Sequence, residues 1–301
     1  MIGKIEFPEG VTSLIGKTTV GDYWGDSVIV PSSLQSFYSY STNKVIRISF
    51  DTSSVTNMSF MFNDCTKLTC IPLFDTSNVT NMGSMFSGCS NLVSVPLFDT
   101  SNVTDMSFMF NDCTKLTCIP LFDTSNVTNM TSMFEECDIL KTIPQLETSN
   151  VTNVSRMFYA CVGLKSIPDM NFSKATNLGT STTSTWLSSA SNIESIGIID
   201  CDSITNVSYM IGRYSQTYLT HLGGFRNLGK ASSVSNTNGS YFMVYAPNLT
   251  YESVMNVINL LYDRAANGLS TLTLKLHANH MAMLSDDDIA IATNKGWTLT
   301  A

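Results

Sequence analysis

The chain has 301 residues, of which 43% are hydrophobic and only 13% are charged, so it is not an intrinsically disordered protein, which would combine low hydrophobicity with high charge. Its net charge of −8 argues against nucleic acid as the main partner, because neutralising phosphates requires clustered lysine and arginine. No apolar run approaches the ~20 residues of a membrane span, and we expect no export signal, because no basic region precedes an apolar core near the start.

Residues 1–50 are predicted to hold degenerate coils and a cap at the start of a repeat array. In the segments at 5–12 and 28–34, apolar residues precede and follow a proline, as they do in the later units. We therefore expect the array to begin close to residue 1.

A repeat of 24 residues dominates the region predicted to be the array proper, residues 51–246. Residues 55–78 match residues 103–126 at 23 of 24 positions, so a double unit of 48 residues has been copied. One of its columns is cysteine, at Cys65, Cys89, Cys113, Cys137 and Cys161. A single unit cannot bury its apolar residues alone, so stacked neighbours must supply a shared core.

Within each unit, apolar residues recur mostly every third position, which is typical of a tight coil that turns corners around one axis. We predict that the M-F-x-x-C segment forms a short helix or 3₁₀ turn. The V-x-x-M and L-x-x-I-P segments are predicted to be extended and to pair in parallel with the same segments of the next coil. Further along, an insertion near 181–184 precedes Trp186 in the Met-Phe slot, and 207–222 gives one more weak coil.

Residues 247–301 are predicted to form an α/β cap that closes the array. Apolar residues at helical spacing indicate a helix over 251–266, followed by a short strand at 271–276. A second helix is predicted to begin after Ser285, a suitable N-cap, and to end at Gly296. Such a cap hides the last open coil from water and from edge pairing.

The unit N-V-T-N-M-S-x-M-F-x-x-C-x-x-L-x-x-I-P-x-F-D-T-S resembles the BspA-type leucine-rich repeat of bacterial surface proteins. The front piece I-E-F-P-E-G-V-T-S-L-I-G resembles the Treponema-type variant, and the tail resembles a segment that follows such repeats in gut bacterial and bacteriophage structural proteins. The resemblance implies an α/β repeat fold, a leucine-rich-repeat-type solenoid with short parallel strands and short helices. It also implies an adhesive role, without identifying a ligand.

Surface adhesins of this family carry an export signal and an anchor, and neither is visible in this sequence. That departure favours a non-enzymatic fibre or receptor-binding protein on a bacteriophage virion, which is released by lysis. The alternative is a bacterial cell-surface adhesin. An enzyme such as a polysaccharide depolymerase would need two facing carboxylates that break the repeat, and we find no such pair. The expected partners are a host surface glycan or protein, other virion proteins and further copies of the chain in a homo-oligomer.

Two columns invite a chemical interpretation. The five stacked cysteines are expected to be buried free thiols, because stacked side chains point the same way, with disulfides or a metal as the alternative. The acidic column of Asp51, Asp75, Asp99 and Asp123 is expected to accept backbone N–H groups in Asx-turns. Its alternative is a cation site, which the replacements at Glu147 and Asn171 disfavour.

No cofactor, catalytic or metal site is predicted. His277 and His280 form an H-x₂-H pair, but no acidic residue or cysteine is placed convincingly beside them. Asp286, Asp287 and Asp288 fit the charge of a helix start. A phosphate-binding glycine loop and the motifs of serine hydrolases and zinc proteases are absent from the sequence.

The candidate binding face consists of outward positions on the L-x-x-I strands. These are Thr69, Cys70, Val93, Ser94, Thr117, Cys118, Lys141, Thr142, Lys165 and Ser166. Phe60 and Phe108 occupy another outward slot, held by Ser84, Ser132 and Arg156 in other coils and by Tyr209 further on. Exposed aromatic rings stack on sugars or anchor a protein partner, and packing against another element or subunit is the alternative.

Overall fold

The computed structural model describes residues 33–41, 51–176, 178, 186–187, 189–205, 218–231 and 246–301. The predicted coil at 5–12, most of the one at 28–34, the insertion at 181–184 and the weak coil up to residue 217 lie outside these ranges, as does Tyr209.

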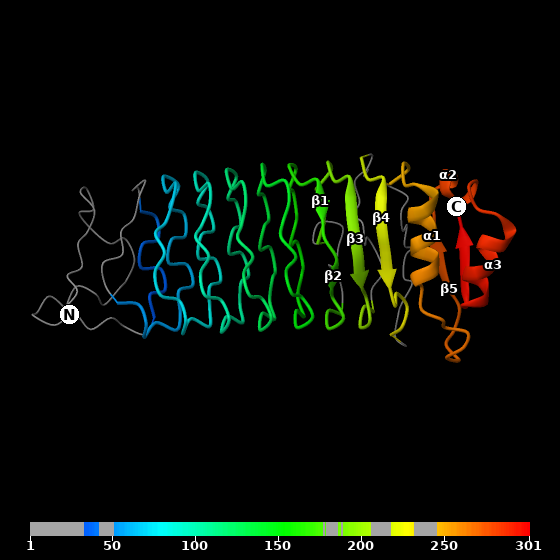
Figure 1. Cartoon of the computed structure of the whole chain (residues 1–301), viewed down its shortest axis with the longest axis horizontal. Coiled ribbons are helices and arrows are strands. Elements are labelled where there is room, and N and C mark those ends of the chain that lie inside the picture. Colours follow the sequence, from blue (N-terminus) through cyan, green and yellow to red (C-terminus); the bar gives the residue numbers. More distant parts are fainter. Residues whose placement is uncertain are drawn as a thin grey trace, which may run out of the picture.

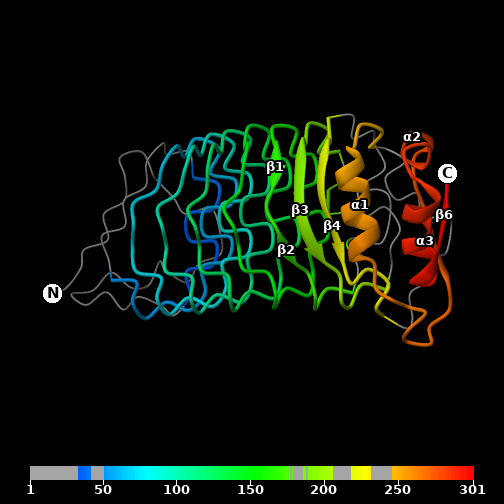
Figure 2. The same cartoon turned by 45° about the vertical axis from the view of Figure 1, so that its right-hand side comes forward.

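Successive 24-residue units stack along the long axis of the molecule (Figures 1 and 2). Isolated parallel bridges join each unit to the next at the same position: Ser33 to Asn57, Asn57 to Asn81, Asn81 to Asp105, Asp105 to Asn129 and Asn129 to Asn153. These bridges lie in the V-x-x-M segments, so the predicted parallel pairing of those segments is confirmed. The described part of the chain is an α/β repeat fold with short parallel strands and few helices.

The M-F-x-x-C segment is a run of overlapping β-turns, which we call the turn run, at 58–65, 82–89, 106–113, 130–137 and 154–161. In the first run, three alternate N–H groups donate to the carbonyl three residues earlier, at 3.1 or 3.2 Å. The N–H groups between them donate to carbonyls of the next coil, at 2.7–2.9 Å. The predicted helix or 3₁₀ turn is wrong here, because a helix would use these donors within its own segment and leave none to join the coils.

Two positions of each turn run adopt the left-handed backbone conformation. In the first run these are Phe60 (φ 56°) and Asp64 (φ 54°), which occupy the third places of the turns 58–61 and 62–65. A positive φ at that place is the mark of a type II turn, and it is costly for any residue with a Cβ. The same two positions are left-handed in every run up to Arg156 and Ala160, and apart from Gly88 they hold residues with a Cβ, so nearly every coil bears the cost.

Aligned side chains fill the interior. The rings of Phe62, Phe86, Phe110, Phe134 and Phe158 stack with centroids 5.4–5.9 Å apart and planes within 8° of parallel. The five stacked cysteines are free and buried, as expected. Each thiol donates to the carbonyl of a core aromatic residue in the preceding coil, as Cys113 does to Phe86 at 3.2 Å.

The acidic column forms the predicted Asx-turns. Asp51, Asp75, Asp99 and Asp123 each accept the N–H group two residues later at 2.9–3.0 Å. Hydrogen bonds from Ser101 and Ser125 hold the pKa of Asp99 and Asp123 below the ordinary range. Beside this column, buried threonines such as Thr100 donate their hydroxyl to a carbonyl of the next coil, at 2.7 or 2.8 Å.

True strands appear where the units lengthen. Strands β1 (Ser166–Ile167) and β2 (Met170–Asn171) both pair in parallel with β3 (Ser195–Asp200), 29 residues later. Strand β3 pairs in parallel with β4 (His221–Arg226). Earlier L-x-x-I segments are joined more sparsely, for example by the N–H group of Thr117 to the carbonyl of Val93 at 3.0 Å.

Helix α1 (Tyr251–Leu260) covers the free edge of β4 (Figure 1). Its N-cap residue Thr250 donates its N–H to the carbonyl of Thr220 at 3.1 Å, and Leu222 donates its N–H to the Ser253 hydroxyl at 3.0 Å. The helix therefore covers the strand edge with hydrogen-bonding groups as well as with its buried apolar residues. An open strand edge would otherwise present unpaired backbone groups.

The rest of the cap is a parallel pair of strands, β5 (Leu272–Lys275) and β6 (Trp297–Thr300), with helices α2 (Ala278–Met281) and α3 (Asp286–Asn294). Ser285 and Asp288 form a capping box at the start of α3, which confirms the predicted N-cap. In the described part of the chain, the helices are too short to cross a bilayer.

Replacing Thr100, a residue that is 1% exposed, by valine removes its hydroxyl and leaves the carbonyl of Asp123 without this donor. We expect a loss of about 1–3 kcal/mol in the free energy of unfolding, measured from urea midpoints. The matched control is Thr104→Val, because the Thr104 hydroxyl makes a similar inter-coil bond at the exposed surface and its loss should stay within ~0.5 kcal/mol. Equal losses in the two variants would contradict this account.

Candidate functional site

The strand face is the surface formed by the exposed positions of the L-x-x-I-P-x segments. Most of the predicted strand-face residues are exposed there, namely Cys70, Val93, Ser94, Thr117, Cys118, Lys141, Thr142 and Lys165, while Thr69 and Ser166 are half-buried. The parallel connections between neighbouring coils bring them together in columns, as the bridge from Thr142 to Ser166 shows. The face therefore presents hydroxyl, thiol and lysine side chains.

An exposed leucine column on this face was missed by the sequence analysis. Leu73, Leu97 and Leu121 are 65%, 59% and 61% exposed, although each stands beside a phenylalanine that turns inward. The sequence contains the pattern that predicts this column, because a leucine stands between the proline and the phenylalanine in each of these three units. In the next two coils the slot holds Gln145 and Asp169, so the apolar column is confined to three coils.

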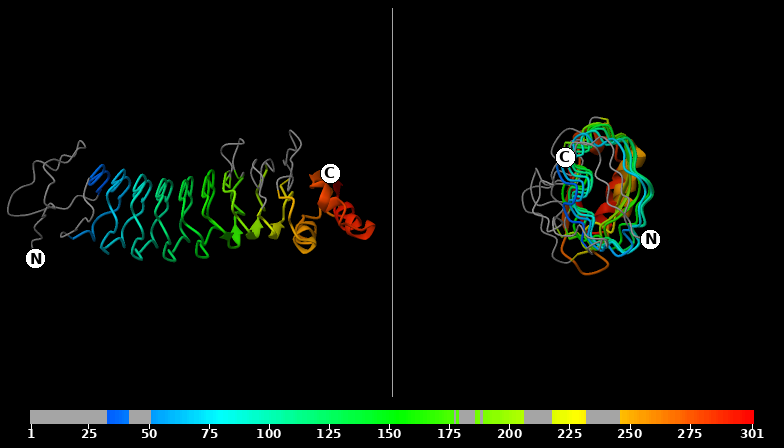
Figure 3. Two further views of the ribbon diagram at one scale, coloured as in Figure 1. Left: turned by 90° about the horizontal axis from the view of Figure 1, so that it is seen from above. Right: turned by 90° about the vertical axis from the view of Figure 1, so that its left-hand side faces the viewer.

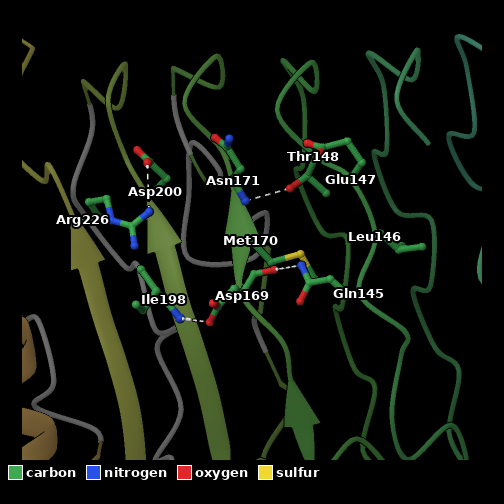
Figure 4. A pocket seen from close by; sticks show the side chains of 10 residues that line it. All are labelled: Gln145, Leu146, Glu147, Thr148, Asp169, Met170, Asn171, Ile198, Asp200 and Arg226. Carbon is green, nitrogen blue, oxygen red and sulfur yellow. Dashed lines mark hydrogen bonds and ion pairs between the residues drawn. The ribbon is translucent and has the colours of Figure 1, made fainter. Parts of the chain in front are cut away.

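A shallow hollow of about 120 Å³ lies where the leucine column gives way to polar residues. It is lined by Gln145, Leu146, Glu147, Thr148, Asp169, Met170, Asn171, Ile198, Asp200 and Arg226 (Figure 4). It marks the lengthening of the unit from 24 to 29 residues, which brings β3 against β1 and β2.

The polar groups of the hollow largely bond to one another. Asp169 accepts the N–H group of Ile198 at 2.7 Å, and Gln145 donates to the carbonyl of Asp169 at 2.6 Å (Figure 4). Residue 197 is required to be glycine, because a Cβ there would lie 2.6 Å from the backbone nitrogen of Asp169 and 2.8 Å from the carbonyl carbon of Pro168. These bonds organise the junction between units of different length.

Electrostatically the hollow is acidic. Burial, followed by the neighbouring Asp202, raises the pKa of Asp200, whose carboxylate lies 3.8 Å from the Arg226 guanidinium. Backbone and hydroxyl hydrogen bonds from Ser149 lower the pKa of Glu147. The hollow therefore combines three carboxylates, at Glu147, Asp169 and Asp200, with the guanidinium of Arg226.

Phe60 and Phe108 belong to a second surface, the turn face, formed by the exposed positions of the turn runs. They are 41% and 39% exposed. Residues 34–41 form an equivalent turn run one coil before the run at 58–65, and it lies on the opposite side of the stack from the strand arrows (Figure 3, left). The structure thus divides the predicted binding residues between two faces.

Metal-binding candidates gain no support from the described residues, among which no three histidine, cysteine or acidic side chains gather around a common point. His277 accepts the N–H group of Asn279 as N-cap of α2, and its ring lies 5.7 Å from the ring of His280. His280 is fully buried. The pair is therefore part of the cap.

Comparison with known proteins gives a family match over much of the chain. A family model described as "Mycoplasma protein of unknown function, DUF285" matches residues 32–118 and 91–195, which together span more than half of the 301 residues. The match supports the resemblance to BspA-type repeats and gives no support to a bacteriophage link. The comparison with curated proteins gives no match.

Among solved structures, a leucine-rich repeat protein from Bacteroides ovatus ATCC 8483, determined at 1.19 Å, is 15% identical. The match covers 85% of this chain and 83% of that chain, with a TM-score of 0.25. A similarity this low defines neither fold nor function.

The stability of the cap should fall as the pH drops from about 7 to 5. Burial, followed by the proximity of His277, lowers the pKa of His280 below 6.5, so the unfolded chain binds a proton that the folded chain resists. Chemical denaturation at several pH values should show this loss, and His280→Leu should reduce it. The control is His221→Asn, because His221 is exposed. An unchanged pH dependence in His280→Leu would contradict the assignment.

Proposed function

We propose that this chain, which belongs to the family described as DUF285, a Mycoplasma protein of unknown function, is a non-enzymatic surface-exposed bacterial repeat protein that attaches to a host surface. Its stacked coils would act as a solenoid scaffold of the leucine-rich-repeat type. The family match supports the bacterial surface alternative over the virion role expected from the sequence, and no finding supports the latter.

The observation that carries this proposal is the exposed leucine column on the strand face. Covering Leu73, Leu97 and Leu121 with a partner would be favourable, because removing apolar surface from water contributes about 25 cal/mol of stabilisation for each Å² buried. Three such residues in register, beside columns of hydroxyl and thiol groups, form a row of similar contacts. This arrangement suits a partner protein with an apolar segment that lies along the stack.

Attachment through such a row would be multivalent. Each coil offers a weak contact, and once one contact has formed the next occurs at high effective concentration. Affinity would therefore depend on the number of coils engaged. Oligomerisation, which remains a proposal, would multiply the number of rows in the same way.

Changing the column to Leu73→Ser, Leu97→Ser and Leu121→Ser should reduce the adhesion of cells displaying the full chain by at least tenfold. A loss of about 1.4 kcal/mol shared by three residues is enough for that change. The assay counts cells retained on host tissue or matrix protein. The matched control is Ile139→Ser with Val162→Ser, which removes two apolar side chains that are also exposed, at 46% and 40%, outside the column.

Undiminished adhesion of the triple-leucine variant, with the urea midpoint retained, would overturn the role of the column. The location is tested separately, by protease treatment of intact cells and by mass spectrometry of purified phage particles. Cleavage on intact cells supports the proposal, whereas finding the chain at fixed stoichiometry in particles and not in envelopes would restore the virion role.

A further inference from the structure

The turn face carries an alternation of small and planar side chains that the strand face lacks. The first left-handed position of successive turn runs holds Ser36, Phe60, Ser84, Phe108, Ser132 and Arg156. A planar group thus stands at every second coil over five coils, with a serine between. The 48-residue double unit explains the two phenylalanines, and Arg156 continues the series in a unit that has diverged.

The planar groups form raised points on this face. Phe60 and Phe108 are about 40% exposed. Ser84, in the coil between them, is 8% exposed, and Ser132, in the coil after Phe108, is 1% exposed. The guanidinium of Arg156 is held by Glu135, with Nε donating to a carboxylate oxygen at 3.0 Å, and it lies 4.0 Å from the centre of the Tyr159 ring. Its charge is therefore paired, and its plane is fixed by two contacts.

The spacing of these groups restricts the kind of polymer that fits them. Adjacent coils bonded like strands are about 4.8 Å apart, so the planar groups recur about every 10 Å. An extended peptide repeats its side-chain orientation about every 7 Å and falls out of step. In an extended β-1,4-linked glycan each ring advances by a distance close to one coil, and alternate rings are turned over. Every second ring then presents the same face, as the planar groups require.

The charge beside the planar column restricts the ligand further. The second left-handed position of the turn runs holds Tyr40, Asp64, Gly88, Asp112, Glu136 and Ala160, so both coils that carry a phenylalanine also carry a carboxylate there. Partial burial first, and then neighbouring carboxylates, raise the pKa of Asp112 and Glu136. Bringing an anionic polymer to this column would increase the repulsion, whereas an ammonium group would relieve it.

We propose that the turn face binds an extended β-1,4-linked amino-sugar polymer. Alternate rings stack on Phe60, Phe108 and Arg156, and the ammonium groups of the rings on the two phenylalanines face Asp64 and Asp112. Each coil accommodates one ring, and the serines leave room for the rings that are turned over. This site lies on the opposite face from the leucine column and does not depend on the function proposed for that column.

The test is isothermal titration of the full chain with the β-1,4-linked hexamer of glucosamine. The N-acetylated hexamer and an α-linked glucose hexamer serve as comparison ligands. We expect the glucosamine hexamer to bind most tightly, with an affinity that falls as salt is added. Phe60→Ala with Phe108→Ala should weaken it on the order of tenfold or more. Asp64→Asn with Asp112→Asn should weaken it and flatten the salt dependence.

The triple-leucine variant serves as the control on the opposite face and should bind the hexamer as the natural chain does, so the two proposals can fail separately. Urea midpoints establish that each variant remains folded. Absence of binding to the glucosamine hexamer, equal affinity for the α-linked hexamer, or full affinity in the double phenylalanine variant would each overturn the inference. Equal affinity for the N-acetylated hexamer would overturn the role given to the carboxylates.

Discussion

The structure depends on how the turn runs distribute their backbone N–H groups. In the run at 82–89, Met85, Ser87 and Cys89 donate within the coil, while Met82, Ser84, Phe86 and Gly88 donate to the next one. A buried amide without a partner costs as much as a lost hydrogen bond, so the second group can be satisfied only if another coil is present. The stack is therefore a requirement of each unit's own backbone.

This constraint explains why the side chains form columns. Inter-coil bonds in fixed register place equivalent residues about one strand spacing apart, so inward positions stack as like with like, as the core phenylalanines do. Many outward positions are free to differ from coil to coil, because the hydrogen bonds of the turn runs that join the coils come from the backbone. The leucine column and the alternation of phenylalanine with serine are two patterns that this freedom permits, and they lie on opposite faces.

The ends of the stack need other solutions. At the C-terminal end, α1 supplies the groups that the next coil would have supplied, including the Ser253 hydroxyl and the carbonyl of Leu260, which accepts the N–H group of Asn227 at 3.0 Å. Where the unit lengthens, the Asp169 side chain takes the place of a backbone acceptor. Both cases follow from the same need to satisfy strand-edge groups.

Some of these features could be predicted from the sequence, because an apolar residue that recurs at the same place in every repeat indicates a buried position. The 24-residue step, the buried free cysteines, the Asx-turns at Asp99 and its equivalents and the N-cap at Ser285 were all predicted. The turn run was not, because a three-residue apolar spacing suits both a 3₁₀ turn and overlapping β-turns, and only the neighbouring coil decides between them. The separation of Phe60 from Thr69 onto opposite faces depends in the same way on how the chain turns between them.

The central claim is that amides of one coil are satisfied by the carbonyls of the next. Residue-resolved hydrogen exchange over 82–89 tests it most directly. The account predicts that the amides of Met82, Ser84 and Phe86 are as strongly protected as those of Met85, Ser87 and Cys89, since both sets become exposed only when coils separate. Exchange of the first set at the rate of an unstructured peptide, with the second set still protected, would show that the coils fold without their neighbours and would contradict the account.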